Sequence, residues 1–156
     1  MKRGINWKVL IISVISVALV AFLGSLFTSK NTNSALYESI KPSITPPNFI
    51  FPIVWTILFI LIAVSLYFVW INANTLYKKE KILFTFSINF ILNVLWSLLY
   101  FGLKNPGNAF IDIIFLDVSI LGMIFVCWKI NKLSAYLLLH YLFWCLFASV
   151  LNFMSI

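Results

Sequence analysis

Residues 9–27 read VLIISVISVALVAFLGSLF, a run of 19 residues that contains no charged side chain. An α-helix rises about 1.5 Å per residue, so about 20 apolar residues are needed to cross the hydrocarbon core of a bilayer. Four further apolar segments have this length, at residues 46–71, 82–103, 109–130 and 133–154. The sequence therefore predicts an all-α integral membrane protein built as a bundle of five transmembrane helices.

The composition of the chain argues against a soluble fold. Of the 156 residues, 63% are hydrophobic and 10% are charged, whereas soluble domains have about 45–50% apolar and about 25% charged residues. The length suits one membrane domain over residues 1–156. Lys2 and Arg3 before an apolar run resemble a secretory signal, but the run is longer than a usual signal core and no A-x-A-like cleavage site follows it. We therefore expect a retained helix.

The distribution of basic residues predicts the orientation in the membrane. The net charge of +7 does not indicate a nucleic-acid partner, because the basic residues lie in short gaps between apolar segments. Eight of them share the side of the N-terminus and three lie on the opposite side. The larger group is Lys2, Arg3, Lys8, Lys78, Lys79, Lys81, Lys129 and Lys132, and the smaller group is Lys30, Lys41 and Lys104. The positive-inside rule then predicts a cytoplasmic N-terminus and a C-terminus outside.

The first gap, residues 28–45, is longer than the other gaps between the predicted helices. Because it contains apolar residues, we expect it to fold back on the helix ends as a lid. Thr45 is placed to cap the next helix and Pro46 to occupy its first position, where a missing N–H costs nothing. Pro52 lies deeper and is expected to bend that helix.

Three of the predicted helices place a tryptophan beside polar, small or aromatic residues at helical spacing. These sets are Trp55 and Phe59; Asn89, Asn93, Trp96 and Tyr100; and His140, Trp144 and Ala148. Flat aromatic faces around a small gap would suit a large planar apolar ligand. The alternative is that the asparagines form hydrogen bonds between helices and that the aromatic residues belong to the core or to a lipid-facing belt.

The few ionisable residues inside the apolar segments leave several roles open. Asp112 suits capping and packing near a helix start. Asp117 lies deeper and is expected to face the bundle interior, protonated or hydrogen-bonded, with a proton relay as the alternative. His140 suits a packing hydrogen bond or, alternatively, haem ligation. Cys127 and Cys145 have no metal-site spacing, and no H-E-x-x-H, P-loop or G-x-S-x-G motif occurs, so we expect no metal site and no required cofactor.

Residues 41–59, KPSITPPNFIFPIVWTILF, resemble the hallmark segment of the TspO/translocator protein family. These proteins are also called tryptophan-rich sensory proteins or peripheral-type benzodiazepine receptors. The resemblance resumes at residues 89–101, similar to the family's N-x-x-x-N-x-x-W segment, and at residues 109–112 and 135–152. It covers the chain from about residue 37 to residue 152.

Three positions depart from the family pattern. Leu36 precedes Tyr37 where the family has a tryptophan, His140 stands in place of a proline, and Ala63 stands in place of a glycine. These differences bear on ligand preference rather than on the resemblance itself.

The resemblance implies a pocket inside the bundle below the first loop, which binds porphyrins and other tetrapyrroles in bacterial members. Eukaryotic relatives bind cholesterol and isoquinoline-carboxamide or benzodiazepine drugs. By position, the ligand-binding residues would be Tyr37, Pro46, Ile50, Trp55, Phe59, Asn93, Trp96, Ser97, Trp144, Ala148 and Leu151. Some bacterial members promote light- and oxygen-dependent porphyrin breakdown, for which Trp55 and Trp144 would be the oxidisable catalytic residues.

Two functions stay open at this point. The first is a membrane receptor for porphyrin or haem, with Lys30, Lys41 and Lys104 available to pair with propionates. The second is a transporter or exporter of small apolar metabolites such as porphyrins, against which stands the lack of an internal repeat. A homodimer also stays open, because no small-xxx-small seam identifies a dimer face. Whether the chain is an enzyme is not decided.

Overall fold

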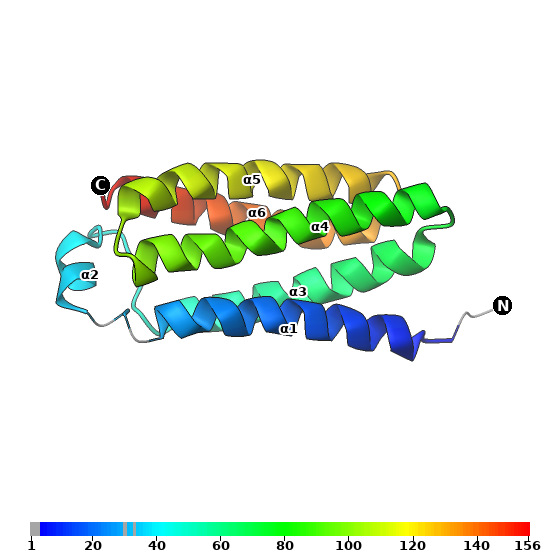
Figure 1. The fold of residues 1–156 in the computed structure, drawn as a ribbon, viewed down its shortest axis with the longest axis horizontal. Coiled ribbons are helices and arrows are strands. Elements are labelled where there is room, and N and C mark those ends of the chain that lie inside the picture. The colour runs from blue at the N-terminus through cyan, green and yellow to red at the C-terminus, as the bar shows by residue number, and fades with distance from the viewer. Residues whose placement is uncertain (1–3, 30, 33) are drawn as a thin grey trace.

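A computed structural model describes residues 4–29, 31–32 and 34–156, and the described chain forms helices and no strands (Figure 1). The elements are α1 (Trp7–Thr28), α2 (Ala35–Ile40), α3 (Ile50–Asn72), α4 (Leu76–Ser97), the π-helical turn η1 (Leu98–Gly102), α5 (Pro106–Trp128) and α6 (Lys132–Phe153). Five helices are long and apolar enough to cross a membrane, with α4 and η1 forming one span. The predicted all-α bundle of five transmembrane helices is confirmed.

The five long helices form a ring. The main contacts join α1 to α3, α3 to α6, α6 to α5, α5 to α4, and α4 back to α1. A contiguous core of side chains such as Ile62, Ile113, Leu138 and Tyr141 fills the centre of this ring. The short helix α2 lies at the opposite end of the bundle from the N-terminus (Figure 1).

Helix α3 begins later than the sequence suggested. Its first residue is Ile50 and its N-cap is Phe49, so the predicted start at Pro46 with Thr45 as N-cap is wrong. Pro46 is followed by a second proline, whose ring disfavours the helical conformation at the preceding residue. Pro52 consequently falls at the third helical position, where no intrahelical partner is needed for its missing N–H, so the expected bend has no cause there.

Helix α4 begins earlier than the predicted residue 82. Its first residue is Leu76, and the side chain of Thr75 caps it by accepting a hydrogen bond from the Lys78 amide at 3.3 Å. Lysine and glutamate are good helix formers, so residues 78–81 extend the helix although they are too polar to be counted in an apolar run. At the other end the α-helix stops at Ser97 and continues as η1, rather than remaining α-helical to residue 103.

Helices α1, α5 and α6 lie close to their predicted segments. Helix α5 begins at Pro106, capped by Asn105, slightly before the predicted residue 109. Helix α6 begins at Lys132, one residue before the predicted start, and its cap is Asn131.

Candidate functional site

A cavity of about 500 Å³ lies at the α2 end of the bundle. It is enclosed by α1, α3, α4, η1, α6 and the loop between α1 and α3, while α5 contributes none of its described lining. The lining residues are Ala21, Gly24, Ser25 and Thr28 of α1; Ser29, Thr32, Tyr37, Lys41, Pro42, Thr45 and Asn48 of the loop; Phe51, Pro52, Trp55, Thr56 and Phe59 of α3; Asn93, Trp96, Ser97, Tyr100 and Phe101 of α4 and η1; and Trp144, Ala148, Leu151 and Asn152 of α6.

The structure brings most of the predicted ligand-binding residues to this cavity. The residues that line it are Tyr37, Trp55, Phe59, Asn93, Trp96, Ser97, Trp144, Ala148 and Leu151. Pro46 and Ile50 do not line it, and their expected place in the pocket is corrected. Pro46 lies in the loop before α3, and Ile50 lies on the side of α3 opposite the stripe that faces the cavity.

Two indoles form one wall of the cavity. Trp55 lies 5.4 Å from the ring of Phe59 and 6.3 Å from the ring of Tyr141, and Trp144 meets Phe51 edge-on at 5.8 Å. The indole Nε1 of Trp144 is buried and donates to no acceptor in the described part of the chain. A buried donor without a partner costs about 1–3 kcal/mol, so an acceptor on a bound molecule would relieve that cost.

The third tryptophan is held by the protein itself. Trp96 donates from Nε1 to Asn152 Oδ1 at 3.0 Å, and Asn152 donates from Nδ2 to the carbonyl of Pro106 at 2.8 Å. The indole also stacks on Tyr100 with centroids 5.3 Å apart. This wall is therefore fixed before any ligand binds. Asn152 was not among the predicted site residues, although it lies one turn beyond the predicted Ala148.

A chain of hydrogen bonds involves the two asparagines of α4. Asn93 donates to the hydroxyl of Tyr141 at 3.0 Å, and that hydroxyl donates to Asn89 Oδ1 at 3.3 Å. Asn89 in turn donates to Ser119 Oγ at 2.9 Å. The interpretation of these asparagines as hydrogen-bonding links between helices is confirmed, because the chain joins α4 to α5 and α6. Asn93 in addition faces the cavity.

The two aspartates of α5 lie outside the cavity lining. Asp117 is buried and accepts a hydrogen bond from Ser149 Oγ of α6 at 2.7 Å, as expected for an interior carboxyl group. Asp112 is the seventh residue of α5, too far from its start to cap it, so the expected capping role is wrong. Asn105 performs that role by accepting from the Asn108 amide at 3.0 Å.

His140 does not share the inner face with Trp144. Its side chain is exposed on the outside of the bundle and does not line the cavity. The haem-ligand alternative therefore has no geometric support. Within the described residues, no group of three histidine, cysteine, aspartate or glutamate residues is placed to hold a metal ion.

The loop between α1 and α3 covers the cavity and includes α2. Ser34 caps α2 by accepting from the Tyr37 amide at 3.3 Å. Tyr37 is buried against Tyr100 and Phe101, with ring centroids 6.4 Å and 5.7 Å away. Burial, reinforced by the neighbouring Tyr100 and Glu38, raises the pKa of Tyr37 to about 12. The hydroxyl therefore stays neutral at physiological pH.

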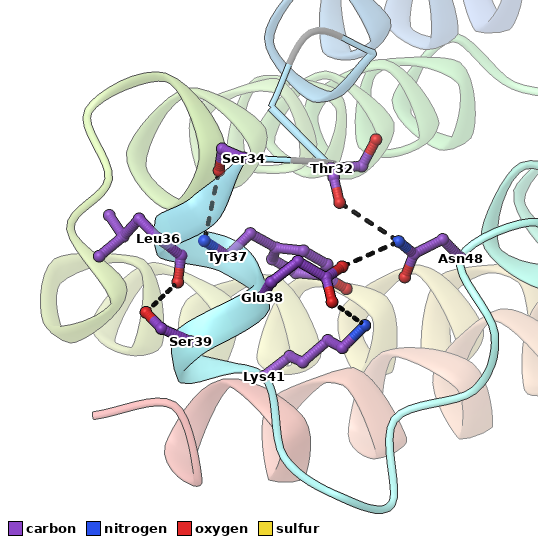
Figure 2. A network of polar contacts seen from close by, with 8 residues as sticks. All are labelled: Thr32, Ser34, Leu36, Tyr37, Glu38, Ser39, Lys41 and Asn48. Atoms are coloured by element: carbon purple, nitrogen blue, oxygen red, sulfur yellow. Dashed lines mark hydrogen bonds and ion pairs between the residues drawn. The ribbon is translucent and has the colours of Figure 1, made fainter.

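A polar latch, formed by Thr32, Glu38, Lys41 and Asn48, holds this loop closed on itself (Figure 2). Glu38 pairs with Lys41 Nζ at 2.6 Å and accepts from Asn48 Nδ2 at 3.2 Å, and Asn48 also donates to the Thr32 carbonyl at 3.3 Å. The hydrogen bond from Lys41, and then that from Asn48, lowers the pKa of the exposed Glu38 carboxyl. The latch joins the start of the loop to the segment just before α3. Neither Glu38 nor Asn48 was predicted to take part in such a contact.

The lysines expected to pair with propionates do not all lie at the cavity. Lys41 lines the cavity, and its ammonium lies 6.0 Å from the centre of the Tyr37 ring. Lys104 is exposed and does not line the cavity. Lys30 lies outside the described residues, as do Lys2 and Arg3, which contribute to the predicted orientation.

These features define a multi-pass integral membrane protein whose helix bundle encloses an aromatic small-molecule cavity beneath a helical loop. The chain belongs to the TspO/MBR family, whose profile matches residues 12–155. It is 40% identical over 144 residues to the tryptophan-rich protein TspO of Archaeoglobus fulgidus, covering 92% of each chain. It is 37% identical to the protein of the same name from Chlorobaculum tepidum, over 86% of this chain and 85% of that one. It is 26% identical to the human translocator protein, over 87% of this chain and 81% of the human one.

Proposed function

We propose that the chain is a membrane receptor for porphyrin-type tetrapyrroles, which it binds in the cavity beneath α2. The observation that carries this proposal is the convergence of Trp55, Trp96 and Trp144 on one cavity from three different helices. The cavity volume of about 500 Å³ lies within the roughly 300–1,000 Å³ of pockets that bury compact organic ligands. Aromatic walls favour a flat apolar ring system over a flexible chain.

The polar groups of the cavity suggest how such a ligand is oriented. The indole N–H of Trp144 has no acceptor among the described residues, so a small rotation of the ring would offer it to an acceptor at one edge of the ligand, and Lys41 supplies one positive charge near α2. A propionate near α2 would compete with Glu38 for that ammonium group. The ring system would then lie between the tryptophans with its carboxylate edge toward α2. With the N-terminus proposed to be cytoplasmic, the α2 end of the cavity lies toward the outer side of the membrane.

The test is a titration of the purified protein with protoporphyrin, followed by quenching of tryptophan fluorescence. Haem and a sterol serve as alternative ligands. We expect saturable quenching by protoporphyrin that falls when Trp55 is replaced by phenylalanine, since that indole lines the cavity. Trp128→Phe is the matched control, because Trp128 is partly exposed near the far end of the bundle and does not line the cavity. Quenching that does not saturate, or that the two variants reduce equally, would contradict the proposal.

A transporter role is the second candidate function. The loop over the cavity favours it, because a loop that opens would also let a ligand pass through the protein. The name of the human relative, translocator protein, points the same way for that protein. Proteoliposomes loaded with labelled porphyrin separate the two roles. A receptor saturates at the amount of protein present, whereas a transporter exchanges or accumulates porphyrin beyond it.

A further inference from the structure

The wall of the cavity between α1 and α3 differs from the rest of its lining. Of the described lining residues, only Ser25, Ser29, Pro52 and Thr56 are exposed, whereas the others are buried or half-buried. Ser25 lies near the end of α1, Ser29 directly follows that helix, and Pro52 and Thr56 lie in the first two turns of α3. The cavity lining is therefore least covered by protein where these two segments face each other.

The opposite flank of α1 is closed at the same depth. A Cβ atom on Gly24 would lie 3.3 Å from Ser97 Oγ, and one on Gly102 would lie 3.2 Å from the ring of Phe27. Backbone and side chains of α1 and of the α4–η1 span are therefore in direct contact there. The less covered flank of α1 is therefore the one that faces α3.

Farther from α2, α1 and α3 are joined. Val17 packs in the same core cluster as Leu58 and Ile62, and the Asn6 amide donates to the hydroxyl of Tyr67 at 3.2 Å. In contrast, α3 has no buried residue before Leu58. The two helices thus pack over their far halves and leave a gap over their α2-proximal halves.

The rim of the gap has its own chemistry. Ser25 Oγ donates to the Phe22 carbonyl and Thr56 Oγ1 to the Pro52 carbonyl, both at 2.7 Å, so each hydroxyl is satisfied within its own helix. Neither hydroxyl needs a partner in the other helix. Helices α1 and α3 can therefore move apart here without breaking these hydrogen bonds. Both residues lie inside membrane-spanning helices, so the gap faces lipid. Small side chains with weakly polar groups let both an apolar body and a polar edge pass.

We propose that the gap between Ser25 and Thr56 is a lateral portal through which the ligand enters the cavity directly from the bilayer. The ligand class that this route selects is a bilayer-dissolved amphiphile with an apolar body and one polar edge. The loop latched by Glu38 stays closed during entry. The identity of the ligand as a porphyrin rests on the proposed function, but the route does not.

The first experiment tests the route without any porphyrin. Ala148 lines the cavity and is buried, so Ala148→Cys places a thiol that a bilayer-dissolved apolar maleimide must reach through the wall. In proteoliposomes, adding Ser25→Phe and Thr56→Phe should slow labelling of this thiol by about tenfold or more. Leu26→Phe with Ile57→Phe is the matched control, because these neighbours are exposed on the outer surface of the same helices and do not line the cavity. The chain without Ala148→Cys corrects for labelling of the buried Cys127 and Cys145.

Equal labelling rates in the portal and control variants would overturn the portal. If the double portal variant does not fold, the single Thr56→Phe variant carries the same comparison. The second experiment measures protoporphyrin binding rates in vesicles. A blocked route should slow both association and release, whereas a change in the cavity contacts alone would act mainly on release. The wild-type chain could fail to bind protoporphyrin while Ser25→Phe and Thr56→Phe still slow thiol labelling. That result would reject the proposed ligand and keep the portal.

Discussion

Replacing Trp144 by phenylalanine should raise stability and lower ligand affinity at the same time. In the unliganded protein the indole Nε1 is buried without an acceptor among the described residues. An unpaired buried donor costs about 1–3 kcal/mol, and the phenyl ring removes the donor while keeping most of the apolar surface. Part of this gain is lost because the smaller ring packs less well. That loss is limited, since Trp144 already borders an open cavity.

The effect on binding has the opposite sign. If the ligand accepts a hydrogen bond from Trp144, the variant loses a contribution of about 0.5–1.5 kcal/mol, which is about two- to tenfold in the dissociation constant. The assay pairs thermal unfolding of the unliganded protein in detergent with the protoporphyrin titration.

Trp96→Phe is the matched control for this prediction. The Trp96 indole donates to Asn152 at 3.0 Å, and Asn152 is 1% exposed. The same substitution there leaves a buried acceptor short of its donor and should lower stability by about 1–3 kcal/mol. A loss of stability in Trp144→Phe as large as that in Trp96→Phe would refute the reasoning, because the two indoles would then not differ in hydrogen bonding.

Three further predictions follow from the same geometry. Asn93→Leu should lower the stability of the unliganded protein by about 1–2 kcal/mol, because the Tyr141 hydroxyl loses its donor. Unchanged stability with weakened binding would instead indicate that the Asn93 amide bonds to the ligand. The latch at Glu38 depends on a carboxylate whose pKa is lowered, so it is present above the ordinary carboxyl pKa and is lost as the pH falls through the lowered value. Loss of the latch should open the loop as a second exit beside the lateral portal. Stopped-flow release of ligand should therefore accelerate in acid for the wild type and be fast already at neutral pH for Glu38→Gln. A pH dependence that persists in the variant would point to another group. Finally, Trp55→Phe combined with Trp144→Phe should keep porphyrin affinity within about tenfold but abolish light-dependent porphyrin loss if the indoles are oxidised. Loss at saturating porphyrin is compared in light and darkness with free porphyrin in detergent, and equal loss in both proteins would remove the enzyme hypothesis.

The number of helices was predictable because the hydrocarbon core imposes one length on every span. The first residues of the helices were harder to predict, and each error has a local cause. At α3 the proline at position 47 keeps Pro46 out of the helix, and at α4 the capping hydroxyl of Thr75 begins a helix whose first turns are too charged for an apolar-run criterion.

The tryptophans of the site were predictable from helical spacing. The direction in which each individual side chain faces was not. Trp144 and Ala148 turn toward the cavity, but His140 lies about 40° further round the helix from Trp144, and that rotation takes it to the outer surface. The contribution of α1 was missed altogether. Hydrophobic side chains occur all round this helix, so the sequence pattern did not distinguish its buried face, which carries Ser13, Val17, Val20 and Gly24.

The position of the cavity follows from how polar bonding is distributed in the bundle. The Asn89–Tyr141–Asn93 chain joins α4 to α6, and Ser149 bonds Asp117 across α5 and α6, so that side of the ring is held by directional bonds as well as by packing. In contrast, the facing ends of α1 and α3 satisfy their hydroxyls internally. Between lipid-facing helices there is no hydrophobic driving force to close such a gap, because lipid tails solvate apolar side chains as well as a neighbouring helix does. A wall without cross-helix hydrogen bonds can therefore stay open in a bilayer at little cost, and access to the aromatic cavity is expected on that side.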